Sequence, residues 1–145
     1  MNVLLSIKLK FVEKIIISLL LVVILNQIVF SQTQKELYKE ICEDMIKAEK
    51  EMENVVQKIR NKYYNDTLFL AKLETSQKRW LQYREAHIEM KFPVKDKQFE
   101  YGSMYPTCYC LEKISITQKR IKDLEMWVNG VIEGDVCPGS TLIED

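Results

Sequence analysis

The middle of the chain carries the stretch Gln77-Lys-Arg-Trp80-Leu-Gln-Tyr83-Arg84-Glu-Ala-His87, inside a strongly helical run. Trp80 and Arg84 are four residues apart, and either His87 or Ile88 continues the same helix face after Arg84. An arginine on an apolar face is energetically costly unless a carboxylate meets it. We therefore predict that this helix is the central element of a helical bundle, and that Arg84 pairs with an acidic residue of a neighbouring helix.

Two further helices are predicted around the central one. Apolar residues recur at three- and four-residue steps from Gln34 to about Tyr64, and again from about Thr107 to Val128. The central helix runs from about Thr67, where Asn65-Asp66-Thr67 caps it, to Lys91, before Pro93. Four glycines and three prolines in 145 residues also favour long helices over a sheet. The predicted fold class is all-α, a three-helix up-down-up bundle stapled by disulfides.

A structured loop is predicted between the second and third helices, from Pro93 to Pro106, and we expect Phe99 and two tyrosines to tether it to the bundle. The loop combines aromatic rings, a flexible glycine and a hydroxyl group, which is the composition of many recognition surfaces. The alternative is a loop that merely caps the core. The candidate partner-binding residues are Tyr101, Gly102, Ser103 and Tyr105.

The N-terminus has the pattern of a targeting segment. Lys8, Lys10 and Lys14 precede an apolar run from Ile15 to Phe30, and Val29-Phe30-Ser31 resembles a small-residue cleavage site. The run is shorter than the roughly 20 residues that span a bilayer comfortably, although a retained membrane anchor is the alternative. We predict a signal peptide over residues 1–31, a helical domain over 32–130 and an irregular tail over 131–145. The mature protein would then be secreted or periplasmic, with no stable membrane span.

The cysteine pattern agrees with an oxidising compartment, where an even number of cysteines forms disulfides by default. The competing zinc site is not favoured, because Cys-x-Cys with two distant cysteines matches no common zinc spacing. Parallel first and third helices would bring Cys42 level with both Cys108 and Cys110. We favour Cys42–Cys110 with Cys108–Cys137, and the swapped pairing stays open.

The sequence contains no recognisable motif for a catalytic, metal or cofactor site. His87 is the only histidine, and no nucleophile motif or Gly-rich phosphate loop accompanies it. Trp80 and Tyr83 are more typical of a core than of a ligand platform, although Tyr83 lies off the main stripe. The formal net charge is zero and no concentrated basic patch is present, so nucleic acid is not an expected partner.

Several motifs together resemble the lysozyme inhibitor LprI-like family of small secreted helical bacterial domains. Gln77-x-x-Trp80-x-x-Tyr83-Arg84-Glu85-Ala86 is similar to the Gln-x-x-Trp-x-x-Phe/Tyr-Arg-Asp-Ala motif of that family, and Ala48-Glu49 begins its first-helix signature. Gly102-Ser103-x-Tyr105-Pro106, Cys110-Leu111 and Thr117-x-x-Arg120-x-x-x-Leu124 follow in the family order. The resemblance covers about residues 34–128. It marks Glu49, Trp80, Tyr83, Arg84 and Arg120 as structural motif residues, with Glu49 as the candidate partner of Arg84.

The sequence departs from the family pattern at three places. His87 stands where the family has a cysteine, so the usual family disulfide cannot form, and Cys42 and Cys137 would supply the replacement. Thr117 lies two residues further from Cys110 than the pattern expects. Glutamate replaces aspartate at positions 49 and 85. These departures weaken the case for assigning the family's activity to this chain more than the case for assigning its fold.

The resemblance implies a secreted or periplasmic, non-enzymatic binding protein that inhibits lysozyme-type muramidases and needs no cofactor. The expected partner is therefore a protein, a lysozyme in the first instance. A structural or envelope-associated interaction module without an enzyme target is the alternative.

Overall fold

The computed structural model describes residues 2–132 and 136–144, with the backbone alone at residues 2–12, 27–30 and 144. The side chains of Lys8 and Lys10, and of Val29-Phe30 in the predicted cleavage site, lie outside the described part. By its internal contacts the chain divides into two compact units, residues 1–39 and residues 40–145.

The described chain is mostly helical, which confirms the predicted all-α class, but it contains four helices where three were predicted. They are α1 (Asn2–Lys62), α2 (Thr67–Lys91), α3 (Lys97–Tyr101) and α4 (Tyr105–Asn129). Helix α1 begins well before the predicted start at Gln34. In the predicted irregular tail, β1 (Val131–Ile132) and β2 (Ile143–Glu144) pair in parallel. Such short strands leave no periodicity in the sequence.

Helix α3 forms within the predicted loop because local polar groups fix both of its ends. The side chain of Asp96 accepts a hydrogen bond from the backbone N–H of Phe99 at 3.1 Å, as an N-cap does. Gly102 ends the helix with φ at 71°, a backbone conformation that residues with a β-carbon rarely adopt. Asp66 caps α2 in the same way, accepting from Phe69 N at 2.9 Å, as the sequence predicted.

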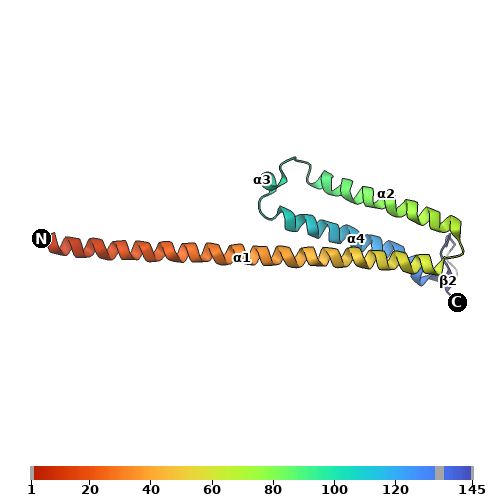
Figure 1. Cartoon of the computed structure of the whole chain (residues 1–145), viewed down its shortest axis with the longest axis horizontal. Helices are drawn as coiled ribbons and strands as arrows, with labels where there is room; N and C mark the ends of the chain where they lie inside the picture. The colour runs from red at the N-terminus through yellow and green to blue at the C-terminus, as the bar shows by residue number, and fades with distance from the viewer. Residues whose placement is uncertain (1, 133–135, 145) are drawn as a thin grey trace. The chain divides into compact units, whose positions relative to one another are not determined.

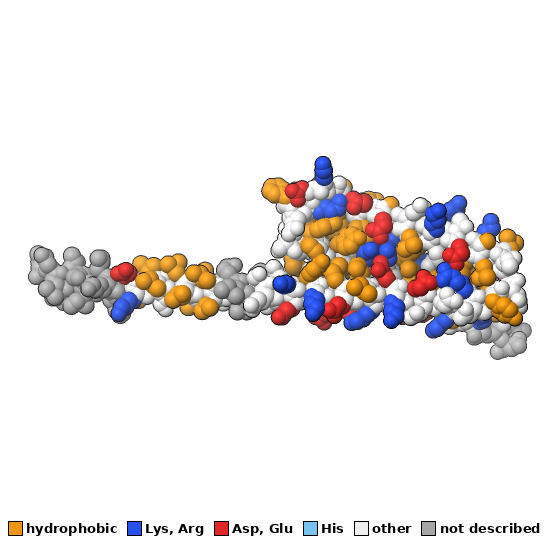
Figure 2. Space-filling view, in the orientation of Figure 1, with side chains coloured by type: hydrophobic (Ala, Val, Ile, Leu, Met, Phe, Trp, Pro, Cys, Tyr) orange, Lys and Arg blue, Asp and Glu red, His pale blue; other side chains and the backbone are white. Residues whose placement is uncertain are grey.

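One helix in the described part of the chain, Glu13–Lys62, is long and apolar enough to cross a membrane by length and composition, and it begins in the first unit. Its most apolar 18-residue window has a mean hydropathy of 2.3. The side chains of residues 13–26 are exposed, and Figure 2 shows apolar side chains covering the visible face of this segment. A signal sequence passes the same test of length and composition, so the finding is consistent with the predicted targeting segment.

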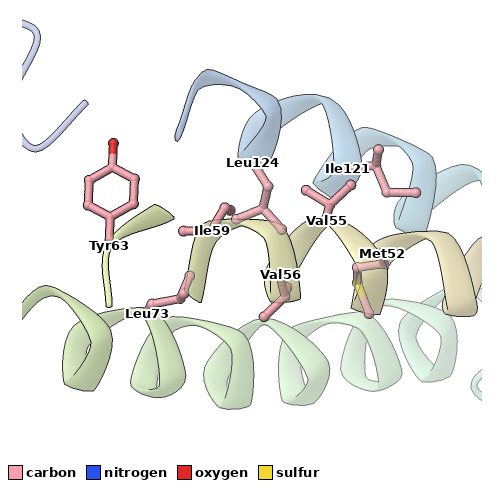
Figure 3. Packing of buried hydrophobic residues seen from close by; sticks show 8 residues of the cluster. All are labelled: Met52, Val55, Val56, Ile59, Tyr63, Leu73, Ile121 and Leu124. Carbon is pink, nitrogen blue, oxygen red and sulfur yellow. The ribbon is translucent and has the colours of Figure 1, made fainter. Parts of the chain in front are cut away.

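The second unit has a hydrophobic core to which α1, α2 and α4 all contribute. The ribbon in Figure 1 shows α2 and α4 lying beside the C-terminal part of α1. Figure 3 shows how their apolar side chains meet between the helices. Fully burying one such aliphatic or aromatic side chain is worth about 1.5–3 kcal/mol. The core consists of Met52, Val55, Val56, Ile59, Tyr63, Leu73, Ile121 and Leu124.

A second, smaller core lies where α2, α3 and α4 meet. Ile88, Phe92 and Ile116 are buried there, and Tyr101 and Tyr105 pack against them. This cluster holds α3 and the turn before α4 against the helices. The arrangement supports the predicted packing of the two tyrosines of the loop.

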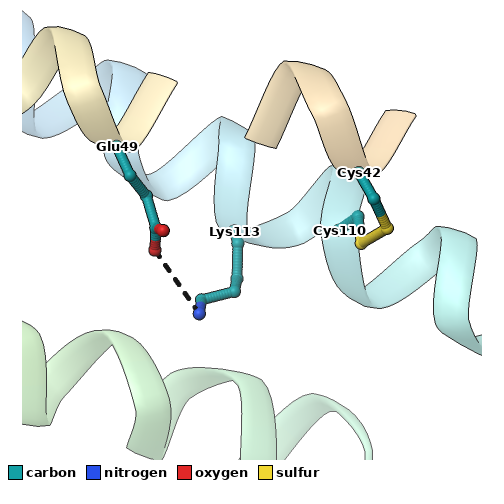
Figure 4. The surroundings of a disulfide bond; sticks show 4 residues. All are labelled: Cys42, Glu49, Cys110 and Lys113. Atoms are coloured by element: carbon teal, nitrogen blue, oxygen red, sulfur yellow. Dashed lines mark ion pairs between the residues drawn. A yellow bond between two sulfur atoms is a disulfide. The ribbon is translucent and has the colours of Figure 1, made fainter. Parts of the chain in front are cut away.

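One disulfide, Cys42–Cys110, is present in the described part of the chain, with the two Cα atoms 5.6 Å apart. It joins α1 to the first turns of α4, as Figure 4 shows. This is the pairing that the sequence favoured. The position of Cys42, level with the start of α4, is therefore as predicted.

The predicted second bond, Cys108–Cys137, is not formed, and Cys108 is a half-buried thiol. Cys108 lies at the start of α4, whereas the tail is attached to its end, where Trp127 Nε1 donates to Ser140 Oγ at 3.0 Å. At 1.5 Å per helical residue the two ends are about 30 Å apart. Cys137 is three residues before Ser140 and cannot cover that distance.

The disulfide should be a major source of stability. Replacing both Cys42 and Cys110 by alanine removes a cross-link between residues 68 apart in sequence. In the chain-entropy account this lowers the free energy of unfolding by about 4 kcal/mol. Urea denaturation followed by circular dichroism would measure it, with Cys108→Ala as the matched control. Equal stability of the double variant and the control would contradict the assignment.

Candidate functional site

Arg84 is buried between the helices, with its side chain only 6% exposed. One of its terminal nitrogens (Nη1) lies 3.0 Å from Oε1 of Glu49 on α1, so the predicted ion pair is present. The same nitrogen donates to Oγ1 of Thr117 on α4 at 3.3 Å, and Nη2 lies 3.2 Å from Oε1 of Glu85. The guanidinium also lies 5.3 Å from the centre of the Trp80 ring. A single side chain thus contacts all three long helices.

Lys113 is the member of this network that the sequence analysis missed. Its ammonium lies 3.5 Å from both Glu49 and Glu85, and its side chain is 13% exposed. Figure 4 shows Lys113 reaching from α4 towards Glu49, on the same side of the helix as Cys110. The spacing of these residues could have revealed the contact. Lys113 follows Cys110 by one helical turn and Glu49 follows Cys42 by two, so both side chains lie on the faces that the disulfide brings together. Two cations and two carboxylates therefore neutralise one another between the helices.

Arg120 is the second arginine in contact with Trp80, whose ring centre lies 5.9 Å from the guanidinium carbon. Its Nε donates to Oε1 of Gln77 at 2.8 Å, and Nη2 donates to Oγ of Ser76 at 2.9 Å. Burial lowers the pKa of Arg120, and attraction to Asp123 opposes that effect. Unlike Arg84, Arg120 is therefore held by neutral acceptors.

Tyr83 and His87 lie on the outer side of α2. Tyr83 is 56% exposed, so it lies outside the core, in keeping with its place off the main apolar stripe. Its hydroxyl lies 3.5 Å from His87 Nδ1. On the other side of the imidazole, Nε2 lies 3.4 Å from Glu112 Oε1. Glu112 also pairs with Lys91, whose hydrogen bond lowers the pKa of that carboxyl group. Lys91, Glu112 and His87 therefore form one contact cluster between α2 and α4.

Two of the predicted partner-binding residues pack against the smaller core, and the other two are exposed. Tyr101 and Tyr105 lie edge-on to Phe92, with ring centres 5.3 and 5.2 Å from it. Gly102 and Ser103 are exposed. Burial raises the pKa of Tyr105, as expected for a phenol against an apolar cluster. The two rings hold the turn in place while the residues between them face solvent.

The prediction that Phe99 tethers the loop to the bundle is wrong, because its side chain is 86% exposed. The reason is the unpredicted helix α3. Residues two apart in a helix point to nearly opposite sides, so the packing of the half-buried Tyr101 against the smaller core turns Phe99 outwards. We call Phe99, Tyr101, Gly102, Ser103 and Tyr105 together the loop surface.

In the part of the chain that the structure describes, no group of three or more His, Cys, Asp or Glu side chains could hold a metal ion.

Comparison with known protein families identifies the architecture built from these residues. The family model described as lysozyme inhibitor LprI matches residues 30–124. The chain belongs to the LprI family. No curated protein and no solved structure matches the chain. The LprI match covers the Arg84 network, the loop surface and the disulfide, but it ends before Trp127 and the tail.

Arg84, Glu49, Glu85 and Lys113 form the Arg84 network. Removing its arginine and removing its carboxylates should lower the free energy of unfolding by different amounts. Arg84→Met removes the buried cation together with its desolvation penalty, and leaves Glu49 and Glu85 with Lys113. The combined variant Glu49→Gln and Glu85→Gln leaves the buried guanidinium without a carboxylate. Breaking a buried pair in this way costs roughly 3–5 kcal/mol, and we expect the lower end because both carboxylates are partly exposed.

Urea unfolding of these variants would measure the asymmetry, with Glu51→Gln on the exposed side of α1 as control. The double variant should be the least stable protein. An Arg84→Met variant that is equally destabilised would show that packing, and not charge, dominates at this position.

The Glu112–Lys91 pair makes the stability depend on pH. Because the pKa of Glu112 is lowered in the folded state, its stabilising effect is present above the unfolded pKa of about 4.3 and is lost as pH falls through the folded value. Lys91→Gln should therefore flatten the acid limb of the stability profile, measured as melting temperature between about pH 5 and 2.5. Lys78→Gln is the control, and an identical acid limb in both variants would exclude this role for the pair.

Proposed function

We propose that this LprI protein acts outside the cytoplasm as a non-enzymatic inhibitor that binds a lysozyme-type muramidase. The observation that carries the proposal is the family match over residues 30–124, since the family is described as one of lysozyme inhibitors. Two features support an extracytoplasmic location. The N-terminal apolar helix is consistent with a signal sequence, and the Cys42–Cys110 disulfide suits an oxidising compartment.

The loop surface is the proposed contact site. Phe99 offers a large apolar ring to a partner, and α3 holds it in place through the Asp96 cap and the Lys97–Glu89 ion pair at 3.0 Å. Aromatic side chains fixed by a rigid support lose little conformational freedom on binding and often dominate protein interfaces. The stacked rings of Tyr101 and Tyr105, which pack against the smaller core, provide that support.

Occlusion of the substrate cleft is the proposed mechanism. Glycoside hydrolases of the lysozyme type cleave between two carboxyl groups that flank the scissile bond. The loop surface would fill the cleft with Phe99, and the exposed Lys95, four residues earlier in the chain, would bring a positive charge towards those carboxyl groups. Substrate would then be excluded without any reaction on the inhibitor itself.

A lysis assay tests the proposal directly. Purified protein should slow the clearing of a bacterial suspension by lysozyme in a dose-dependent way. Phe99→Ala should raise the concentration needed for half-inhibition at least ~10-fold, because interface anchors of this kind contribute about 2 kcal/mol or more. Leu68→Ala is the matched control, since Leu68 is 71% exposed at the other end of α2.

Unchanged lysis at a large molar excess of the wild-type protein would overturn the inhibitor function. Equal loss of inhibition in the Phe99 and Leu68 variants would overturn the assignment to the loop surface alone.

The second candidate is an envelope-associated interaction module without an enzyme target. The exposed apolar side chains of residues 13–26 favour it, because a retained segment of this kind would keep the domain at a membrane. Capture of a cell-envelope protein by the purified domain, together with no binding to any muramidase, would support this second function over the first.

A further inference from the structure

A small pocket lies at the end of the helical domain opposite the loop surface, and the mechanism proposed above does not use it. Its volume is about 210 Å³. Phe69 and Leu73 from the start of α2 and Leu124 and Trp127 from the end of α4 form apolar walls. Ser140 adds a wall from the tail, fixed by its hydrogen bond with Trp127. The pocket is therefore assembled from three separate parts of the chain.

Two positive charges border these apolar walls, on Arg120 and Lys72. Among the described residues, neither side chain forms an ion pair. Asp123 acts on Arg120 only through longer-range attraction. A guanidinium has five N–H donors, and Gln77 and Ser76 use two of those of Arg120. The remaining donors and the ammonium of Lys72 are available to an anion.

We propose that this pocket binds a small apolar carboxylate. The apolar walls bury the hydrocarbon part, and Arg120 and Lys72 bind the carboxylate through charge-assisted hydrogen bonds. Pockets for drug-sized ligands measure roughly 300–1,000 Å³, so this smaller one suits a ligand about as large as one aromatic side chain. A neutral ligand of the same shape would leave both cations without a counter-charge and would bind more weakly.

The pocket is completed by residues that lie outside the family match. The LprI match ends at residue 124, so Trp127 and Ser140 lie beyond it, whereas the other lining residues, Arg120 among them, lie within it. The closed site therefore depends on the C-terminal part of this chain, and its ligand goes beyond the inhibitor function. Its test involves no muramidase, so the two proposals fail independently.

Calorimetric titration of the full-length protein with 4-phenylbutyrate tests the pocket, with 4-phenylbutyramide as the neutral ligand of the same shape. We expect saturable one-to-one binding of the acid and at least tenfold weaker binding of the amide. Equal affinities would overturn the assignment of the cations, and absence of binding at millimolar concentration would overturn the site. Each ligand is also titrated into the same detergent without protein, and that heat is subtracted, because the acid and the neutral amide partition into micelles to different extents.

Surface variants locate the bound ligand. Lys72→Glu replaces an exposed cation of the pocket, whereas Lys78→Glu makes the same change in net charge elsewhere on α2. The first should weaken binding of 4-phenylbutyrate at least tenfold and the second should leave it unchanged. Equal loss in both variants would show a non-specific charge effect and overturn the site. Arg120→Gln should abolish binding while circular dichroism still shows the helical content of the wild type.

Discussion

The buried guanidinium of Arg84 is the constraint on which the helical domain depends. A charge in this position needs partners on every side, and Glu49, Glu85 and Thr117 supply them from α1, α2 and α4. These directional contacts favour one rotation of each helix about its axis. An apolar residue here would lack them, so we infer that the arginine contributes specificity more than net stability.

The features that the sequence predicted are those that local signals and regular helices determine. The bounds of α2 followed from the cap at Asp66 and from Pro93, and the pairing of Cys42 with Cys110 followed from placing two parallel helices side by side. Glu49 was identified as the partner of Arg84 through the family resemblance. Helix α3 could not be predicted in that way, because five residues show no period and only Asp96 and Gly102 define the ends. The exposure of Phe99 followed from that omission, since its direction depends on whether the segment is helical.

The pocket at the other end was unpredictable for a different reason. Trp127 and Ser140 become neighbours only because the tail folds back on α4 and forms the parallel pair β1–β2. No motif marks that contact, and the tail has no pattern of apolar residues. The same folding back explains why Cys137 lies far from Cys108. Contacts between an irregular segment and a distant part of the chain are the hardest to predict from sequence, because no periodic pattern or motif indicates them.

The disulfide also determines how the domain would respond to mechanical force. Tension applied at the N-terminus of α1 enters the second unit at Glu40 and meets Cys42 two residues later. The covalent bond passes the load to α4 before it reaches the first buried residue of the main core, Met52. A pull through the apolar segment would therefore reach the core through two covalently linked helices, and it would not peel α1 away from α4 one turn at a time.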